Sequence, residues 1–156
     1  MSDIAEADTG YIARRLIADT VAASAEQVYM ELAKNKLALT KNGVYKVRKS
    51  GPAPCGEPVD VESPTIASAL KVIPLLITPS LRKTINSYAG KHVVEKLLHT
   101  NYISNGELIM AMMMLGYKWR LPPGEKDSVN VLFYALYTSL ELNDWIANCP
   151  CDVPRF

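Results

Sequence analysis

Cysteine and histidine are scarce in this sequence of 156 residues, which contains three cysteines and two histidines. An odd number of cysteines does not make a disulfide framework, and Pro150 between Cys149 and Cys151 leaves little geometry for a bridge between these near neighbours. The cysteine content therefore favours a reducing compartment.

Long apolar runs are also lacking. The longest nearly uncharged stretch, residues 63–80, contains Lys71 and is interrupted by prolines, and no basic signal-like segment precedes it. We therefore expect neither a transmembrane helix nor a secretory signal. The expected location of the protein is the cytoplasm, a nucleoid or a virion, and no membrane partner is expected.

Constellations of catalytic residues are missing as well. The sequence has no glycine-rich phosphate loop, no Ser-His-Asp set and no suitably placed Cys-His pair. His92, His99, Cys149 and Cys151 come nearest to a zinc set, but no pair of them has a usual ligand spacing. We therefore predict a protein without enzymatic activity, cofactor or bound metal.

What the sequence does contain is enough apolar residues for a core, and one basic block. With 49% hydrophobic residues, the chain suffices for one ordinary globular domain or two small ones. The net charge is only +1, but six cations and no acid lie in one short stretch: Lys34, Lys36, Lys41, Lys46, Arg48 and Lys49. Such a block is typical of a surface that meets phosphate, and equally of an exposed strand edge on which lysines prevent aggregation.

A hairpin with a cationic face is predicted within this basic block. Asn42-Gly43 is a strong hairpin-turn signal, and the segments on its two sides, residues 36–40 and 44–49, alternate between apolar and polar residues. On the second segment, Tyr45 and Val47 face opposite to Lys46 and Arg48.

Other helices and short strands are expected on both sides of the hairpin. Apolar spacing predicts one long helix from Tyr11 to Leu32, and a capping box at Ser24 leaves open a break near Ala23. Alternation, apolar content and the helix start Thr78-Pro79-Ser80 predict three more elements: strands at Val59–Glu62 and Lys71–Leu76, and a helix from Pro79 to His99.

A separate helix-hairpin-helix unit is expected towards the end of the chain. Ser104 and Glu107 form a capping box before a helix at Leu108–Leu115, which Gly116 can end in the left-handed conformation. We expect its methionines to fill a core: Met110, Met112, Met113 and Met114. A hairpin of residues 117–121 and 129–135 and a helix at 138–145 follow, and Trp119 and Trp145 leave open a partner surface or a small core.

The chain resembles the histone-like HU/IHF family of DNA-bending proteins from about residue 16 to residue 86. The first stretches that carry the resemblance are the lysine-rich and then apolar passage Leu32–Leu39, Gly43, and Tyr45-Lys46-Val47-Arg48-Lys49. Ala53–Val61 is similar to a shortened form of the family's two-stranded arm, with Pro54 at its tip. Lys71-Val72 and Thr78-Pro79-Ser80, with the helix start after them, resemble the end of the family's fold.

This resemblance implies an α+β protein with an HU/IHF-like domain at residues 1–86, made of a helix and a three-stranded sheet with a shortened arm, and a helix-rich extension at 87–156. It implies a dimer that binds double-stranded DNA as an architectural protein, with arms along the phosphates and a tip proline in the minor groove. The DNA-binding residues that it indicates are Lys46, Arg48, Lys49, Pro54, Arg82 and Lys83. The alternative is a structural or assembly protein of a phage or virus particle, a homo- or hetero-oligomer that uses this fold for contacts with proteins.

Overall fold

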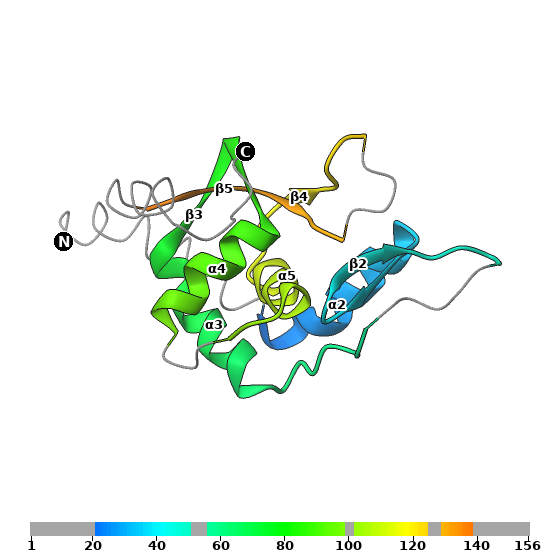
Figure 1. Ribbon diagram of the computed structural model, residues 1–156, viewed down its shortest axis with the longest axis horizontal. Coiled ribbons are helices and arrows are strands. Elements are labelled where there is room, and N and C mark those ends of the chain that lie inside the picture. The colour runs from blue at the N-terminus through cyan, green and yellow to red at the C-terminus, as the bar shows by residue number, and fades with distance from the viewer. Residues whose placement is uncertain (1–20, 51–55, 99–101, 125–128, 139–156) are drawn as a thin grey trace.

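The computed structural model describes residues 21–50, 56–98, 102–124 and 129–138. These residues form four helices and two antiparallel sheets, which confirms the predicted α+β class. The elements in chain order are α2 (Val21–Lys34), β1 (Leu37–Thr40), β2 (Gly43–Lys46), α3 (Pro64–Leu76), β3 (Ile77–Asn86), α4 (Ser87–Leu97), α5 (Asn105–Met114), β4 (Trp119–Arg120) and β5 (Leu132–Tyr137). Figure 1 shows α5 in the middle of the molecule, between the β1–β2 hairpin and the strand β3.

Helix α2 leads the chain into the hairpin. Val28 and Leu32 are buried on its inner side, one turn apart, as expected for an amphipathic helix. The helix runs unbroken from Val21 to Lys34, so the break near Ala23 that the sequence left open does not occur, while residues 11–20 lie outside the described part of the chain. Lys36 then adopts a φ of 55°, and the chain reverses into β1.

Strands β1 and β2 confirm the predicted hairpin. Leu39 pairs with Val44, and Thr40 pairs with Gly43, so the turn residues are Lys41 and Asn42, one position earlier than the sequence suggested. Gly43 has a φ of 136°, and an added Cβ there would lie 2.1 Å from the carbonyl oxygen of Val129. A residue without a side chain is therefore needed at this end of β2.

The apolar run at residues 71–76, predicted as a strand, is the second half of helix α3. Ser63 caps this helix, since its Oγ accepts a hydrogen bond from the Thr65 N–H at 3.1 Å, and proline occupies the first helical turn. Ile66, Ala69 and Ile73 recur at helical spacing and are completely buried. Short apolar runs fit a buried strand and a buried helix equally well, so periodicity alone did not distinguish them.

The predicted helix from Pro79 is also wrong over its first eight residues, because β3 extends to Asn86. Helix α4 begins only at Ser87, and the Asn86 side chain caps it by accepting a hydrogen bond from the Tyr88 N–H at 2.8 Å. Strand β3 forms nevertheless, because it pairs with β5, a strand about 50 residues further along the chain. Such long-range pairing overrides the local helix-start signal.

The predicted third strand at Val59–Glu62 is absent, so the described sheet of the hairpin has two strands and not three. Asp60 turns the chain here: its Oδ1 accepts from the Glu62 N–H at 3.0 Å, and its carbonyl oxygen accepts from the Ser63 N–H at 3.1 Å. Aspartate favours such turns because its short side chain bonds to the backbone two residues on. The turn directs the chain into α3.

The second sheet joins residues from both sides of the predicted domain boundary at residue 86. Its strand order is β3-β5-β4, and Trp119 pairs with Phe133, so the predicted hairpin of residues 117–121 and 129–135 is confirmed. The Tyr117 hydroxyl donates a hydrogen bond to the Ile77 carbonyl oxygen at 2.5 Å. Buried residues before and after residue 86 pack into one hydrophobic core, so this position does not separate two cores.

Helix α5 forms the centre of this core. All ten of its residues are buried, including the four methionines, which confirms their expected core-filling role. Its predicted capping box is present, and Gly116 ends the segment with a φ of 86°. An added Cβ at Gly106 would lie 1.8 Å from the carbonyl oxygen of Thr40, so the hairpin turn packs directly on the start of α5.

Within the described ranges, none of the helices has the length and apolar character needed to span a bilayer.

Candidate nucleic-acid interface

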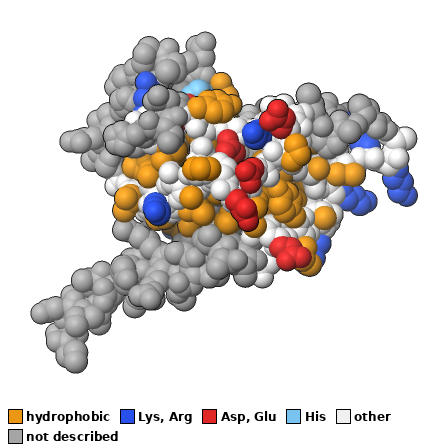
Figure 2. All heavy atoms as spheres, turned by 90° about the horizontal axis from the view of Figure 1, so that it is seen from below, with side chains coloured by type: hydrophobic (Ala, Val, Ile, Leu, Met, Phe, Trp, Pro, Cys, Tyr) orange, Lys and Arg blue, Asp and Glu red, His pale blue; other side chains and the backbone are white. Residues whose placement is uncertain are grey.

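Five exposed cations lie around the open end of the β1–β2 hairpin, and we call them the cationic cluster: Lys34, Lys36, Lys46, Arg48 and Lys49. The fold brings them together. Lys34 ends α2, Lys46 pairs with Leu37 at the last position of the ladder, and the Val47 N–H donates to the Lys36 carbonyl oxygen at 2.8 Å. Figure 2 shows lysine and arginine side chains at the same end of the molecule as the hairpin.

The cations gather at one end of the hairpin rather than along one face. Leu39 and Val44 face the core, and alternation places Lys46 on that same side, where it is exposed because the ladder ends there. Tyr45 and Val47 lie on the opposite side, and Val47 is 54% exposed. Tyr45 and Lys46 therefore face opposite sides, as predicted, while Val47 and Arg48 follow the end of β2. The side of β2 that bears Lys46 is the one that packs on the core through Val44.

Lys41, the sixth cation of the basic block, belongs to the other end of the hairpin. Its Nζ lies 3.3 Å from Glu57 Oε2, and its backbone N–H donates to the Glu57 carbonyl oxygen at 2.8 Å. Because a carboxylate already pairs with Lys41, this residue is less available to an external phosphate.

Arg82 and Lys83, predicted at a helix start, lie in an irregular stretch of β3 between Pro79 and Thr84, where the register with β5 shifts. Ser80 Oγ accepts hydrogen bonds from both of their N–H groups, at 3.2 and 3.1 Å. In Figure 1 the strand β3 and the hairpin lie on opposite sides of α5, so the structure does not bring these two residues to the cationic cluster. Pro54, the predicted arm tip, lies outside the described residues.

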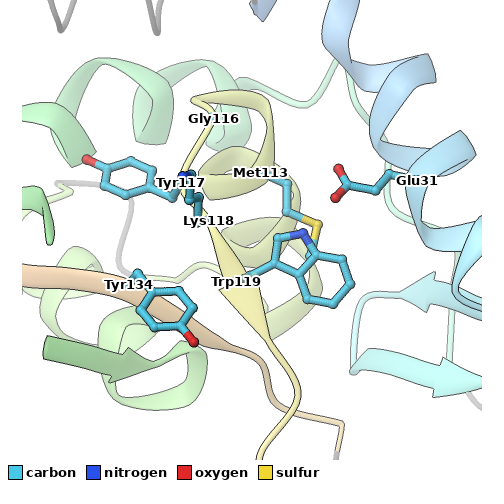
Figure 3. A pocket seen from close by; sticks show the side chains of 7 residues that line it. All are labelled: Glu31, Met113, Gly116, Tyr117, Lys118, Trp119 and Tyr134. Atoms are coloured by element: carbon cyan, nitrogen blue, oxygen red, sulfur yellow. The ribbon is translucent and has the colours of Figure 1, made fainter. Parts of the chain in front are cut away.

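A pocket that sequence reasoning did not predict lies close to the end of α2. Its volume is about 370 Å³, and α2, the end of α5, β4 and β5 form its walls. We call it the Trp119 pocket; the residues that line it are Glu31, Met113, Gly116, Tyr117, Lys118, Trp119 and Tyr134. Figure 3 shows Trp119, Met113 and the Glu31 carboxylate on one side of the pocket and Tyr134 on the other.

Trp145 lies outside the described residues, and Trp119 has the core role, one of the two that the sequence left open. It is only partly buried and packs against the hydrophobic core, and it also lines the pocket. The only signal in the sequence was an aromatic residue beside two cations, Lys118 and Arg120, on a short strand. That pattern could not predict that Glu31, 88 positions earlier in the chain, lines the same pocket as Trp119.

The remaining polar cluster has a structural role. On α4, Glu95 Oε1 lies 2.5 Å from Lys91 Nζ and accepts a hydrogen bond from the Ile103 N–H at 3.3 Å, while Glu95 Oε2 lies 3.2 Å from His92 Nδ1. These contacts attach α4 to the segment before α5. Over the described part of the chain, no three histidine, cysteine or acidic residues lie close enough to share a metal ion.

Comparison of the chain with protein-family models, with curated protein sequences and with solved structures finds no match.

Proposed function

We propose that this protein binds double-stranded DNA without catalysis, as an architectural protein of the HU/IHF type, through the cationic cluster. The observation that carries the proposal is the grouping of five exposed cations at the hairpin's open end, in a stretch from Lys34 to Lys49 that contains no acid. Neighbouring phosphates of a duplex present closely spaced negative charges, which a compact group of lysines and arginines neutralises.

Such binding should depend strongly on salt, because each neutralised phosphate releases condensed counterions. The logarithm of the binding constant falls with the logarithm of the salt concentration by about 0.9 for each phosphate contact. If all five residues of the cationic cluster contact phosphates, the slope should be roughly −4 to −5. The contacts specify no base sequence by themselves.

The test is fluorescence anisotropy with a labelled duplex at several salt concentrations. We compare the unmodified chain with Lys46→Ala/Lys49→Ala and with the matched control Lys71→Ala/Lys96→Ala, which removes two exposed lysines from α3 and α4. We expect the first variant to lose affinity and about two units of salt slope, and the control to bind like the unmodified chain.

Equal losses in both variants would mean that general charge, and not the cationic cluster, causes the binding. Absence of binding at low salt would remove the DNA-binding function altogether. A third variant, Arg82→Ala/Lys83→Ala, tests whether the irregular stretch of β3 contacts the same duplex, and we expect a smaller loss because it lies across α5 from the hairpin.

A structural or assembly function is the second candidate, and exposed leucines around the β3–β5 sheet favour it. Leu81 on β3 is 83% exposed and Leu75 at the end of α3 is 63% exposed, while Leu136 on β5 is also exposed. Exposed apolar groups of this kind can serve protein contacts. Sedimentation of the unmodified chain and of Leu75→Ser/Leu81→Ser/Leu136→Ser at rising concentrations tests this candidate, which requires that only the unmodified chain associate.

A further inference from the structure

We infer that the Trp119 pocket takes one unpaired nucleobase of a single-stranded nucleic acid, stacked on the Trp119 indole, with the Glu31 carboxylate accepting a hydrogen bond from an amino group of the base. This inference rests on the nucleic-acid binding proposed above and adds the form of the strand that the protein prefers. The site would recognise single-stranded segments, or unpaired ends beside a duplex.

The size and walls of the pocket suit a flat aromatic ligand. Its volume of about 370 Å³ lies near the lower end of the range for small-ligand sites, about 300 to 1,000 Å³. Trp119, Tyr134 and the Met113 thioether offer aromatic and polarisable surface. Every base has a π face, so stacking on a partly exposed tryptophan tolerates different bases and is a common feature of single-strand binding.

Cations on two sides of the pocket can meet the phosphates next to the bound base. Lys118 lines the pocket just before β4, and Arg120 is the last residue of β4; both are exposed. Lys34 follows Glu31 by three residues on α2, which places the two side chains on neighbouring positions of one helix face. Since Lys34 belongs to the cationic cluster, a strand on that cluster would reach the pocket without crossing the molecule.

Glu31 gives the pocket its chemical selectivity. A carboxylate repels phosphate, so its presence in the wall opposes a site for a free phosphate or a phosphate group of the backbone. It accepts hydrogen bonds from amino groups, such as the N4 amino group of cytosine. Unpaired thymine offers only its N3 imide hydrogen, between two carbonyl oxygens that repel a carboxylate, so the pocket should prefer bases with an amino group over thymine.

The pocket requires an unpaired base. In a duplex both faces of a base are stacked on its neighbours, so Trp119 could not stack on it without extrusion of the nucleotide, although one amino hydrogen stays accessible in the groove. The cationic cluster needs phosphates only and therefore serves single strands and duplexes alike. Duplex and single-strand affinities should thus respond differently to changes at the two places.

The test measures anisotropy of labelled oligonucleotides of about 12 nucleotides, oligo-dC and oligo-dT, beside a duplex of the same length. The full chain is compared with Trp119→Leu, which keeps apolar bulk, Trp119→Phe, which keeps an aromatic face, and the control Tyr102→Leu, at an exposed aromatic residue that does not line the pocket. We expect Trp119→Leu to weaken oligo-dC binding roughly 5- to 100-fold and Trp119→Phe to weaken it less. Duplex binding and the control should stay unchanged.

Glu31→Ala separates base recognition from charge. Removing a carboxylate strengthens binding to any polyanion, but only a hydrogen bond to the base changes the ratio of oligo-dC to oligo-dT affinity. We expect the unmodified chain to prefer oligo-dC, and the variant to bind the two oligonucleotides equally. In a Trp145→Phe background, whose sole tryptophan is Trp119, emission should be quenched by oligo-dC.

The possible failures are distinguishable. Duplex binding that persists while Trp119→Leu leaves oligo-dC affinity unchanged would overturn the nucleobase site and leave the proposed function intact. Emission quenched by an arginine-rich peptide and not by oligo-dC would overturn it too, because the occupant would then be a cationic side chain. Absence of binding to every nucleic acid would remove both the proposed function and this site.

Discussion

The two ends of the β1–β2 hairpin differ in what surrounds them. At the turn end, the Gly106 N–H donates to the Lys41 carbonyl oxygen, the Val44 N–H donates to the Val129 carbonyl oxygen, and Lys41 has a carboxylate partner. At the open end, five exposed cations surround the last pair of the ladder. One short hairpin is thus held against the core at one end and presents charge to solvent at the other.

This contrast separates stability from binding. Changes at the turn end should lower the free energy of unfolding, because they disturb packing and buried hydrogen bonds. Changes at the open end should alter nucleic-acid affinity with little effect on folding, because exposed charges contribute little to stability.

The largest expected effect is that of Gly106→Ala at the turn end. The added Cβ would lie 1.8 Å from the Thr40 carbonyl oxygen, so either the hairpin or α5 must move. We expect a loss of about 3 kcal/mol or more in chemical denaturation. Gly124→Ala is the control, since nothing lies within 4 Å of its added Cβ, and its positive φ alone should cost about 1 kcal/mol. Equal losses would show that the turn end does not need its close packing.

Raising the pH tests whether the β3-β5-β4 sheet unfolds together with the turn end of the hairpin. Burial raises the pKa of Tyr137 to about 12, and its hydroxyl has no hydrogen-bond partner among the described residues. The folded state therefore keeps a proton that the unfolded state releases near pH 10. Stability from this group is complete below pH 10 and falls between pH 10 and 12, by roughly 2 to 3 kcal/mol.

Tyr137→Phe supplies the control for this pH dependence. The variant should lose less stability than the unmodified chain between pH 10 and 12, and near pH 7 it should be at least as stable, because a buried hydroxyl without a partner is removed. Thermal denaturation across this pH range measures both. Parallel pH curves for the two chains would contradict the assigned cause.

Asn105→Ala should have a somewhat smaller effect at the turn end. The Asn105 Nδ2 group donates to the Asn42 carbonyl oxygen at 3.1 Å and to Asn130 Oδ1 at 2.9 Å, which ties α5 to the turn and to the segment before β5. Its Oδ1 is buried with no partner among the described residues, so its removal offsets part of the loss. We expect about 1 to 2 kcal/mol in urea denaturation.

Asn35→Ala is the matched control for this prediction. The Asn35 Nδ2 group donates to the Glu31 carbonyl oxygen at 2.9 Å, but this hydrogen bond is exposed at the end of α2. We expect a loss of about 0.5 kcal/mol or less. A loss as large as that of Asn105→Ala would mean that burial does not explain the difference.

The smallest expected effect on stability belongs to the open end. Lys46→Ala/Lys49→Ala should change the free energy of unfolding by no more than about 0.5 kcal/mol, because both side chains are exposed. The same variant is expected to lose salt-dependent DNA affinity. If it instead unfolded as readily as Gly106→Ala, the contrast between the two ends of the hairpin would be wrong.

Elements with a local cause were predictable from the sequence. The hairpin, the capping box of Ser104 and Glu107, and the left-handed Gly116 each depend on a few adjacent residues, and all are present. Strand β3 was not predictable, because its stability comes from pairing with β5 and its local residues favour a helix start. The apolar run of α3 was ambiguous because apolar residues occupy its exposed side as well as its buried side, Leu75 among them, which hides the helical period.

The same division applies to the candidate interface. Lys46, Arg48 and Lys49 are close in sequence, so a hairpin suffices to group them, whereas Arg82 and Lys83 were grouped with them only by the resemblance and lie across α5. Neighbouring residues were enough to predict a basic hairpin and a methionine-rich helix that fills a core. The pairing of β3 with β5, and the pocket that Glu31 shares with Trp119, join residues far apart in the chain and therefore depend on how the elements pack.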